Sequence, residues 1–264
     1  MIESLQNEQV KFVASLQRHK GRQETQLFVI EGRRFVEEAV RRNAPIEKVF
    51  VCREREAPEW QVLHKMLHER DIPMETVTKR VLRKMSATEE PQGILAVIRQ
   101  TAYTIADIEI AHHSLLLIID GIQDPGNLGT ILRTALAAGV RHVFLTPGTV
   151  DIYNPKVLRS TMGAIFSLIL LPEQRPEDIL VFCRERGLNV FMGDIQGSSL
   201  YQTKLAAGPA ALVVGNEGKG PSPLFRSAAV QRLTIPMAQN VESLNVAIAA
   251  GILLYEFVRQ RGLL

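Results

Sequence analysis

The C-terminal part of the chain alternates apolar runs with amphipathic stretches. The amphipathic stretches predict helices at LGTILRTALAAG, around KVLRSTMGAIF, at PEDILVFCRERG and from about Ser243 to Arg259. Near-continuous apolar strands that alternate with such helices are typical of a mostly parallel sheet covered on both faces. The apolar runs that predict these strands are LLLIID (115–120), HVFLTP (142–147), SLILLP, NVFMGDI, AALVVGN and RLTIPM.

The first 99 residues show a similar mixed pattern on a smaller scale. Helices are predicted at VKFVASLQRHKG, GRRFVEEAVRRN and around WQVLHKMLHERD, and short strands at FVI, KVFV and ILAVIR. The linker QTAYTIADIEIAHHS separates these elements from the first strong strand of the C-terminal part. We therefore predict an α/β protein with two domains, residues 1–104 and residues 105–264.

The composition is that of an ordinary globular protein, with 46% hydrophobic and 22% charged residues. No stretch approaches the roughly 20 apolar residues that a membrane-spanning helix needs, so we predict no membrane partner. The two cysteines, Cys52 and Cys183, lie far apart without metal-ligand spacing, which suits a reducing compartment. These features predict a cytoplasmic protein.

The excess of positive charge lies in the N-terminal part. Residues 1–99 carry 18 Lys and Arg against 15 Asp and Glu, whereas residues 100–264 carry 13 of each. Clustered basic side chains either neutralise nucleic-acid phosphates or form a solvated helix face. The two clusters are Lys11, Arg18, Lys20, Arg22, Arg33, Arg34, Arg41 and Arg42, and then Lys79, Arg80, Arg83 and Lys84.

Three loops that follow predicted strands combine glycines with polar side chains. They are GIQDPGNLGTILR (121–133), GNEGKGPS (215–222) and IPMAQNVESLN (235–245). In open parallel sheets, ligands bind beyond the carboxyl ends of the strands. Glycines there let a ligand approach the backbone closely and reach its N–H donors. We therefore expect the ligand site where these loops meet.

Several common sites are excluded by spacing. The glycines of the first loop do not form the G-x-G-x-x-G dinucleotide fingerprint, and Pro221 stands where a P-loop requires lysine. Asp120 ends a strand, as a phosphotransferase aspartate does, but Ile122 occupies the place of its acidic partner. His64 and His68 share a helix face without a further ligand candidate, so we predict no metal site.

The three loops contain amides, a carboxylate, an arginine and a serine. They contain no metal-ligand set, no cysteine nucleophile and no Ser-His-Asp arrangement. Such a set can position a neutral nucleophile beside a pre-activated donor, and it is poorly suited to hydrolysis. These residue types alone do not identify the reaction.

In this order, the three loops resemble the signature motifs of the SpoU (TrmH-like) branch of the SPOUT superfamily, the RNA ribose 2′-O-methyltransferases. The resemblance covers roughly residues 115–259 and includes the intermediate segment RSTMGAIFSL (159–168). The first motif stands as DPGNLGTILRTALAAG, with Asn127 and Arg133 at its marked positions. The second stands as VVGNEGKG, with Glu217, and the third as IPMAQNVESLNVAIAAGILLYE, with Ser243 and Asn245.

The N-terminal part resembles the small RNA-binding domain attached to many of these enzymes, which is related to the ribosomal-protein L30e-like fold. The similar segments are FVIEGRRFVEEAV (28–40) and PQGILAVIR (91–99), in the basic part of the chain. For Arg33 and Arg34 the resemblance implies contact with RNA phosphates, although a solvated helix face explains the same residues.

The resemblance implies a C-terminal domain with a deep trefoil knot, against the rule that chains avoid knots. It implies S-adenosylmethionine as the methyl donor, no metal, and a homodimer through the knotted domain with the active site close to the interface. In the last helix, the stripe Ala247, Ala250, Gly251 and Leu254 permits close packing, either at that interface or inside one subunit. The implied cofactor-binding residues are Gly215, Asn216, Ile235, Met237 and Leu244.

The resemblance assigns catalysis to Asn127, Arg133, Glu217, Ser243 and Asn245. Family accounts make the motif arginine the base, but a guanidinium with a pKa above about 12 keeps its proton. We therefore expect Arg133 to clamp the phosphate beside the target ribose, while a phosphate oxygen or water takes the proton. Asn127 fixes the loop or the ribose, or forms an Asx turn, and Glu217 orients Arg133 or the loop amides, or is simply exposed. Ser243 caps the last helix or contacts a ligand, and Asn245 lies in the first turn of that helix.

Three rival functions are a non-catalytic RNA-binding or assembly factor, a base-modifying SPOUT enzyme and a small-molecule methyltransferase. The presence of the marked residues disfavours the first, their ribose-type combination the second, and the basic N-terminal part the third. Ribosomal RNA is the favoured substrate because of the appended domain, and transfer RNA is the alternative. The target nucleotide, the general base and the physiological role are not encoded in any readable pattern, because RNA is recognised largely by shape and splayed bases.

Overall fold

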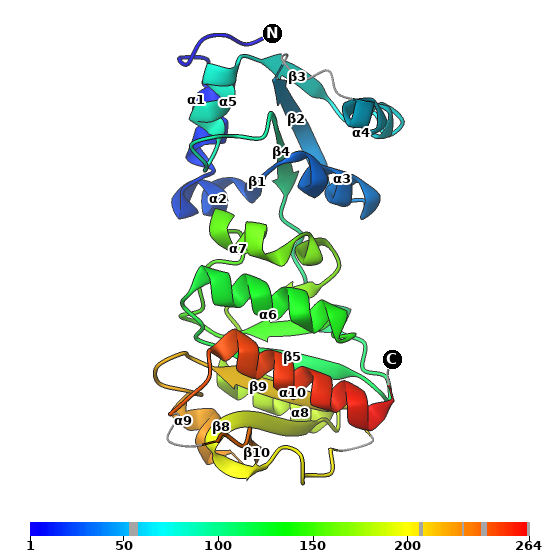
Figure 1. Ribbon diagram of the computed structural model, residues 1–264, viewed down its shortest axis with the longest axis vertical. Helices are drawn as coiled ribbons and strands as arrows, with labels where there is room; N and C mark the ends of the chain where they lie inside the picture. The colour runs from blue at the N-terminus through cyan, green and yellow to red at the C-terminus, as the bar shows by residue number, and fades with distance from the viewer. Residues whose placement is uncertain (53–57, 206–207, 229, 239–241, 263–264) are drawn as a thin grey trace. The chain divides into compact units, whose positions relative to one another are not determined.

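The computed structural model describes residues 1–52, 58–205, 208–228, 230–238 and 242–262, and its helices and strands are drawn in Figure 1. The chain forms two compact units. The first comprises Met1–Thr101 and Tyr153–Phe166, and the second comprises Ala102–Ile152 and Ser167–Leu264. Each unit contains its own sheet and its own buried core.

The first unit is built on a four-stranded mixed sheet in the order β1-β4-β2-β3. β4 pairs antiparallel with both β1 and β2, and β2 pairs parallel with β3. Apolar residues of α1 and α5 pack against this sheet around Phe50 and Leu95. The elements are α1 (Glu8–Ser15), α2 (His19–Thr25), β1 (Leu27–Glu31), α3 (Arg33–Arg41), β2 (Ile46–Cys52), α4 (Pro58–His68), β3 (Met74–Val77), α5 (Lys79–Met85) and β4 (Ile94–Arg99).

Two details of this unit differ from the sequence prediction. The single helix predicted at VKFVASLQRHKG is divided into α1 and α2, because Leu16 ends the first helix and Arg18 is extended. The pattern also missed β3 and α5. In β3 only Val77 is buried, and α5 has seven residues, so neither is long enough to show a clear period.

The segment Tyr153–Phe166 carries the helix α7 (Pro155–Thr161) and belongs to the first unit. The ring of Tyr153 lies 4.6 Å from that of Phe28 in β1, and the ring of Phe166 lies 5.6 Å from that of Phe35 in α3. A stretch from the middle of the chain therefore packs with the N-terminal sheet, by contacts that hydrophobic periodicity does not encode.

The second unit contains a six-stranded sheet in the order β10-β8-β9-β5-β6-β7, and every pairing given for it is parallel. α6 and α10 lie side by side on one face, and α8 covers the other (Figure 1). The predicted mostly parallel sheet is confirmed, whereas the trefoil knot stays a prediction. The elements are β5 (Leu115–Asp120), α6 (Pro125–Ala137), β6 (His142–Leu145), β7 (Ile169–Leu171), α8 (Pro176–Glu185), β8 (Asn189–Ser199), β9 (Ala210–Gly215), α9 (Pro223–Ser227), β10 (Gln231–Thr234) and α10 (Val246–Arg261).

The central strands β5 and β9 bring two of the glycine-containing loops together. All six residues of each strand are buried, which explains their near-continuous apolar sequences. The strands pair in register from Leu115 and Ala210 to Asp120 and Gly215. The loops that follow Asp120 and Gly215 therefore begin next to each other at the same edge of the sheet.

Two sequence expectations concern membrane helices and thiols. None of the helices in the described residues is long and apolar enough to cross a bilayer. Cys52 and Cys183 are free and buried. Burial raises the pKa of the Cys183 thiol to about 12, so this side chain stays protonated and unreactive.

Candidate active site

The first glycine-containing loop is shorter than its sequence predicts, because α6 begins at Pro125. Asp124 is the N-cap, and its side-chain oxygen accepts a hydrogen bond from the Asn127 N–H at 2.8 Å. Pro125 occupies the first helical position, where its missing N–H costs nothing. Asn127 thus lies in the first turn of α6, and the predicted helix start at Leu128 is wrong.

Glu217 joins the second loop to the first. Its carboxylate accepts hydrogen bonds from the Asp124 N–H at 3.0 Å, from the Gln123 N–H at 3.3 Å and from the Asn127 side-chain amide at 3.3 Å. Partial burial raises the pKa of Glu217, but these bonds and one from its own N–H outweigh that effect and lower the pKa below its ordinary value. Glu217 is therefore an ionised anchor at neutral pH.

Asn245 joins the third loop to the same cluster. Its side-chain Nδ2 donates to Asn127 Oδ1 at 3.0 Å, while its Oδ1 accepts from the Ala247 and Ile248 N–H groups at 2.9 and 3.3 Å. Asn245 is therefore the N-cap of α10, which begins at Val246. The predicted helix start and cap at Ser243 are wrong, because the Asn245 oxygen bonds the free N–H groups of the first turn.

Arg133 lies apart from this hydrogen-bonded set. It is exposed on α6, six residues after Asn127, which is about 9 Å along the helix axis. Among the described residues, no hydrogen bond or ion pair of Arg133 joins it to Asn127, Glu217, Ser243 or Asn245. The structure thus brings together Asn127, Glu217 and Asn245 and leaves the guanidinium of Arg133 free to meet a partner from outside the subunit.

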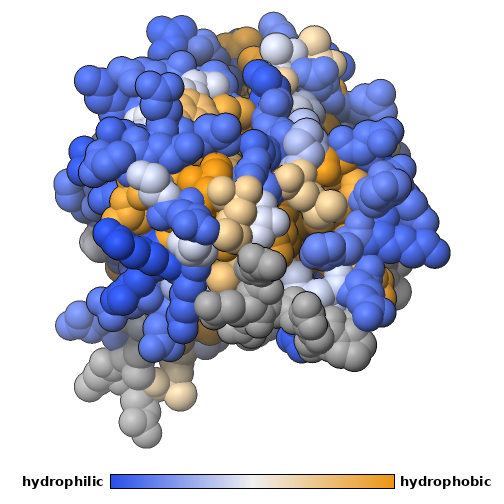
Figure 2. Space-filling model, turned by 90° about the horizontal axis from the view of Figure 1, so that it is seen from above, coloured by the Kyte–Doolittle hydropathy of each residue, from blue (hydrophilic) through white to orange (hydrophobic). Residues whose placement is uncertain are grey.

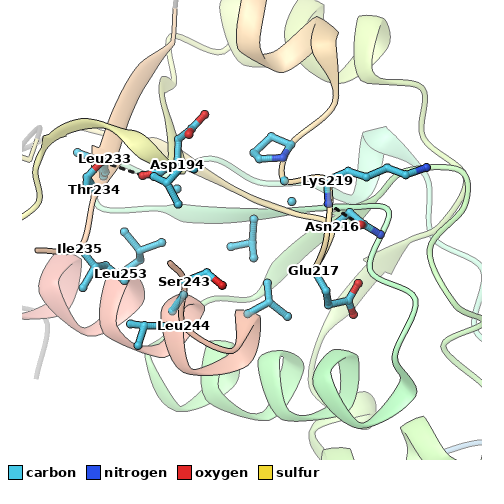
Figure 3. Close-up of a pocket in the computed structure, with 18 of the residues that line it drawn as sticks. Asp194, Asn216, Glu217, Lys219, Leu233, Thr234, Ile235, Ser243, Leu244 and Leu253 are labelled. Carbon is cyan, nitrogen blue, oxygen red and sulfur yellow. Dashed lines mark hydrogen bonds between the residues drawn. The ribbon is translucent and has the colours of Figure 1, made fainter. Parts of the chain in front are cut away.

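A cavity of about 370 Å³ opens beside Glu217 (Figure 3). Ser243 and Glu217 line it, and so do all five residues for which the resemblance implied cofactor binding: Gly215, Asn216, Ile235, Met237 and Leu244. Residues 239–241 of the third loop lie outside the described residues.

Sequence reasoning missed a fourth contribution to this cavity, from the middle of β8. Gly193, Asp194 and Ile195 line it together with Thr234 and Leu253. β8 and β10 shift register between Arg232 and Leu233, so that their partners are Met192 and Ser198. Residues 193–197 therefore bulge from the ladder. The signal was available in NVFMGD, an apolar strand that ends in glycine and aspartate.

The lining of the cavity fits S-adenosylmethionine. Leu233, Ile235, Leu244 and Leu253 provide an apolar wall for an adenine ring. The Oδ2 atom of Asp194 is buried and has no hydrogen-bond donor among the described residues. A buried acceptor of this kind needs a donor, which a ligand with hydroxyl or amino groups supplies.

Asp120, at the end of β5, holds the second loop in place by hydrogen bonding. This residue is 6% exposed, and its carboxyl oxygens accept from the Thr146 hydroxyl at 2.9 Å and the Ser222 N–H at 2.6 Å. The Asn216 side-chain amide donates to the Gly121 carbonyl at 2.7 Å, which adds a second link between the loops. The shape of the cavity wall at 216–222 therefore depends on the end of β5.

We expect Asp120→Asn to weaken S-adenosylmethionine binding about tenfold or more, because an amide oxygen accepts the Ser222 N–H more weakly than a carboxylate does. A buried hydrogen bond to a charged group contributes about 1.5–3 kcal/mol. Calorimetry on the two proteins measures the change. Thr146→Val is the control: it removes one bond to Asp120 without touching the Ser222 contact, and a loss as large as that of Asp120→Asn would contradict the proposed link to the loop.

The small-residue stripe of α10 packs inside the subunit. Ala247, Ala250 and Leu254 are buried, and a methyl group added at Gly251 would lie 3.6 Å from the Thr134 side chain of α6. The intramolecular alternative is therefore confirmed for this stripe. Another stripe of α10 is solvent-facing and apolar: Ile248 and Tyr255 are 57% and 45% exposed, and Ile252 between them is partly exposed.

The basic residues of the first unit differ in their availability. Arg22 is buried and donates to the Leu16 carbonyl, so its assignment to a phosphate-binding cluster is wrong. Arg33 forms an ion pair with Glu37, whereas Arg34 is exposed. Four basic residues of α5 are exposed, and no ion pair is found for any of them among the described residues: Lys79, Arg80, Arg83 and Lys84. Figure 2 shows how hydrophilic side chains dominate one face of the molecule.

Comparison with known proteins gives matches along nearly the whole chain. Residues 114–255 match the SpoU rRNA methylase family, and residues 7–96 match an MRM3-like substrate-binding domain. The chain is 35% identical over 254 residues to the 23S rRNA (guanosine(2553)-2′-O)-methyltransferase RlmP of Bacillus subtilis, covering 96% of this chain and 97% of that protein.

Solved structures agree with these matches. The AdoMet-bound rRNA methyltransferase from Sinorhizobium meliloti is 29% identical, with a TM-score of 0.87 over 98% of this chain and 97% of that one. An RNA 2′-O ribose methyltransferase is 32% identical, with a TM-score of 0.84 over 100% and 99% of the two chains. The expected methyl donor and RNA ribose methyltransferase activity are thereby confirmed, and the chain belongs to the SpoU rRNA methylase family.

Proposed function

We propose that the protein methylates the ribose 2′-hydroxyl of a guanosine in ribosomal RNA, with S-adenosylmethionine as donor. The observation that carries the proposal is the hydrogen-bonded set Asn127, Glu217 and Asn245, of which Glu217 lines the cofactor cavity. The ribosomal substrate and the guanosine are supported by the activities for which similar proteins are named, among them RlmP of Bacillus subtilis. Transfer RNA is the alternative.

The reaction requires alignment and removal of one proton. When bound, S-adenosylmethionine would supply a methyl group activated by its positively charged sulfur, and the sulfur would leave as the ribose oxygen takes the methyl group. Asn127, Glu217 and Asn245 hold the three loops in one arrangement. Alignment of two reactants in an enzyme can contribute about 7–11 kcal/mol to catalysis. Arg133 clamps the phosphate beside the target and stabilises the developing alkoxide, and a phosphate oxygen or water takes the proton.

RNA is held by the N-terminal domain, residues 1–104, and methylated by residues 105–264. The match to a substrate-binding domain at residues 7–96 supports this division. The exposed basic residues of α5 are better suited to phosphates than Arg33, whose charge is already paired with Glu37. Arg34 is exposed and contributes from α3.

A homodimer forms through the C-terminal domain. The exposed apolar stripe Ile248, Ile252 and Tyr255 on α10 supports this, because apolar residues clustered on one helix face are favoured at subunit contacts. The compartment is the cytoplasm, in keeping with two free cysteines.

The proposal is tested by mapping ribose methylation in total RNA from cells with and without the protein. We expect one guanosine of ribosomal RNA to lose its 2′-O-methyl group and to regain it when the gene is restored. Loss of a methyl group from transfer RNA instead would show that transfer RNA is the substrate. An unchanged methylation map with altered ribosome assembly would favour a non-catalytic factor.

A further inference from the structure

Asp194 is held in one orientation at the wall of the cofactor cavity. Its Oδ1 accepts a hydrogen bond from the Gln196 N–H at 3.0 Å, and its main-chain carbonyl accepts one from the Thr234 hydroxyl at 2.8 Å. The remaining oxygen, Oδ2, is buried without a donor among the described residues. A carboxyl oxygen that is buried and unpartnered is costly, so its position calls for a ligand.

The position of Asp194 along the cavity limits which part of the cofactor it can meet. Figure 3 shows Thr234 and Ile235 at one end of the cavity, Asn216, Glu217 and Lys219 at the other, and Asp194 between them. In the proposed function the reacting methyl lies near Glu217, which is bonded to Asn127 and through it to Asn245. The adenosine part therefore extends toward the opposite, apolar end.

We propose that Asp194 binds the ribose hydroxyls of S-adenosylmethionine through Oδ2. At this end the cofactor offers two kinds of donor, the vicinal hydroxyls of the ribose and the amino group of adenine. The ribose joins the adenine to the sulfur, so it spans the middle of the cavity beside residues 193–195, while the adenine packs among Ile235, Leu244 and Leu253. A carboxyl group that accepts from ribose hydroxyls is a recurrent solution in nucleotide sites.

The bulge of β8 explains how the carboxyl group reaches this place. Residues 193–197 leave the ladder between the pairs Arg232–Met192 and Leu233–Ser198. Glycine at position 193 leaves room for Leu253 beside the bulge, since a methyl group there would lie 2.8 Å from the Leu253 side chain. Asp194 is therefore a cofactor-binding residue that lies outside the three loops with recognisable motifs.

The inference is tested by calorimetry with S-adenosylhomocysteine, its 2′-deoxy and 3′-deoxy analogues, and its analogue without the adenine amino group. We expect Asp194→Ala to weaken S-adenosylhomocysteine binding by about tenfold to a hundredfold. The deoxy analogues, which lack the donor, should bind the variant and the original protein with more similar affinities. The deamino analogue should lose as much affinity in the variant as S-adenosylhomocysteine does.

Controls separate this role from a structural one. Asp194→Asn keeps the acceptor for the Gln196 N–H, so its Tm should match that of the original protein while its affinity falls. Asp178→Ala removes an exposed aspartate of α8 and should leave affinity unchanged. Equal affinity of Asp194→Ala and the original protein, or a deficit abolished only by removal of the adenine amino group, would overturn the inference.

The inference rests on S-adenosylmethionine as cofactor. The experiment distinguishes an error in the cofactor assignment from an error in the role of Asp194. If the unsubstituted protein does not bind S-adenosylhomocysteine, the cofactor assignment is wrong. If it binds and the loss in Asp194→Ala is the same for every analogue, only the role of Asp194 toward the ribose is wrong.

Discussion

Replacing Arg133 by alanine is expected to reduce methyl transfer by about 10²–10³-fold, the range found when one group that stabilises developing negative charge is removed. Arg133 is exposed and contributes no hydrogen bond to its own subunit among the described residues, so its removal should leave the fold intact. The variant lacks the positive charge that the guanidinium places beside the target phosphate and the developing alkoxide. Single-turnover methylation of a substrate RNA fragment measures the effect.

Two further variants show how Arg133 acts. Arg133→Lys keeps the charge but loses the planar, bidentate geometry, so it should remain strongly impaired if the residue clamps a phosphate. A fully active lysine variant would refute the clamp. Arg141→Ala removes another exposed arginine of the same unit and should be as active as the original protein. S-adenosylmethionine affinity, measured by calorimetry, should be unchanged in Arg133→Ala.

Replacing Gly215 by alanine is expected to abolish measurable S-adenosylmethionine binding, with affinity lowered at least 100-fold. A Cβ at position 215 would lie 2.1 Å from the Pro221 nitrogen and 2.4 Å from the Gly220 carbonyl carbon. These are backbone atoms, so the second loop must move, and the Ser222 bond to Asp120 moves with it. Overpacking of this kind costs about 1–3 kcal/mol, and calorimetry with thermal unfolding measures both consequences.

Gly208 offers a matched control for this substitution. It lies just before the same strand, and a Cβ there would meet, among the described residues other than its chain neighbours, nothing closer than the Asn189 side-chain nitrogen at 3.9 Å. Gly208→Ala should therefore bind S-adenosylmethionine normally and unfold at the original temperature. Normal cofactor binding by Gly215→Ala would contradict the close approach of the two chain segments.

The parallel sheet was accessible from the sequence because its strands are buried on both faces. β5 and β9 consist of six buried residues each, and such strands appear as uninterrupted apolar runs. The short elements β3 and α5 could not be predicted in this way. β3 has one fully buried residue and α5 has seven residues in total, so the local pattern was too short to distinguish them.

For the candidate site too, part could be predicted from the sequence and part could not. Motif residues were recognisable in the chain, but the contacts between them join positions about 90 to 120 apart: Glu217 bonds the first turn of α6, and Asn245 bonds Asn127. The capping role of Asn245 depends on where α10 begins. The residue types near Ser243 did not determine that start. Asp194 carried no motif, and only the bulge of β8 brings it to the cavity.

The sequence by itself determined the class of fold, the basic character of the N-terminal part and the residues of the three glycine-containing loops. These features depend on local periodicity and composition, which each segment displays independently. Tertiary structure alone decided which loops meet, which basic residues are already paired, and which acceptor remains without a donor. Those properties arise from contacts between distant segments, and their geometry is fixed by strand register and packing rather than by any local pattern.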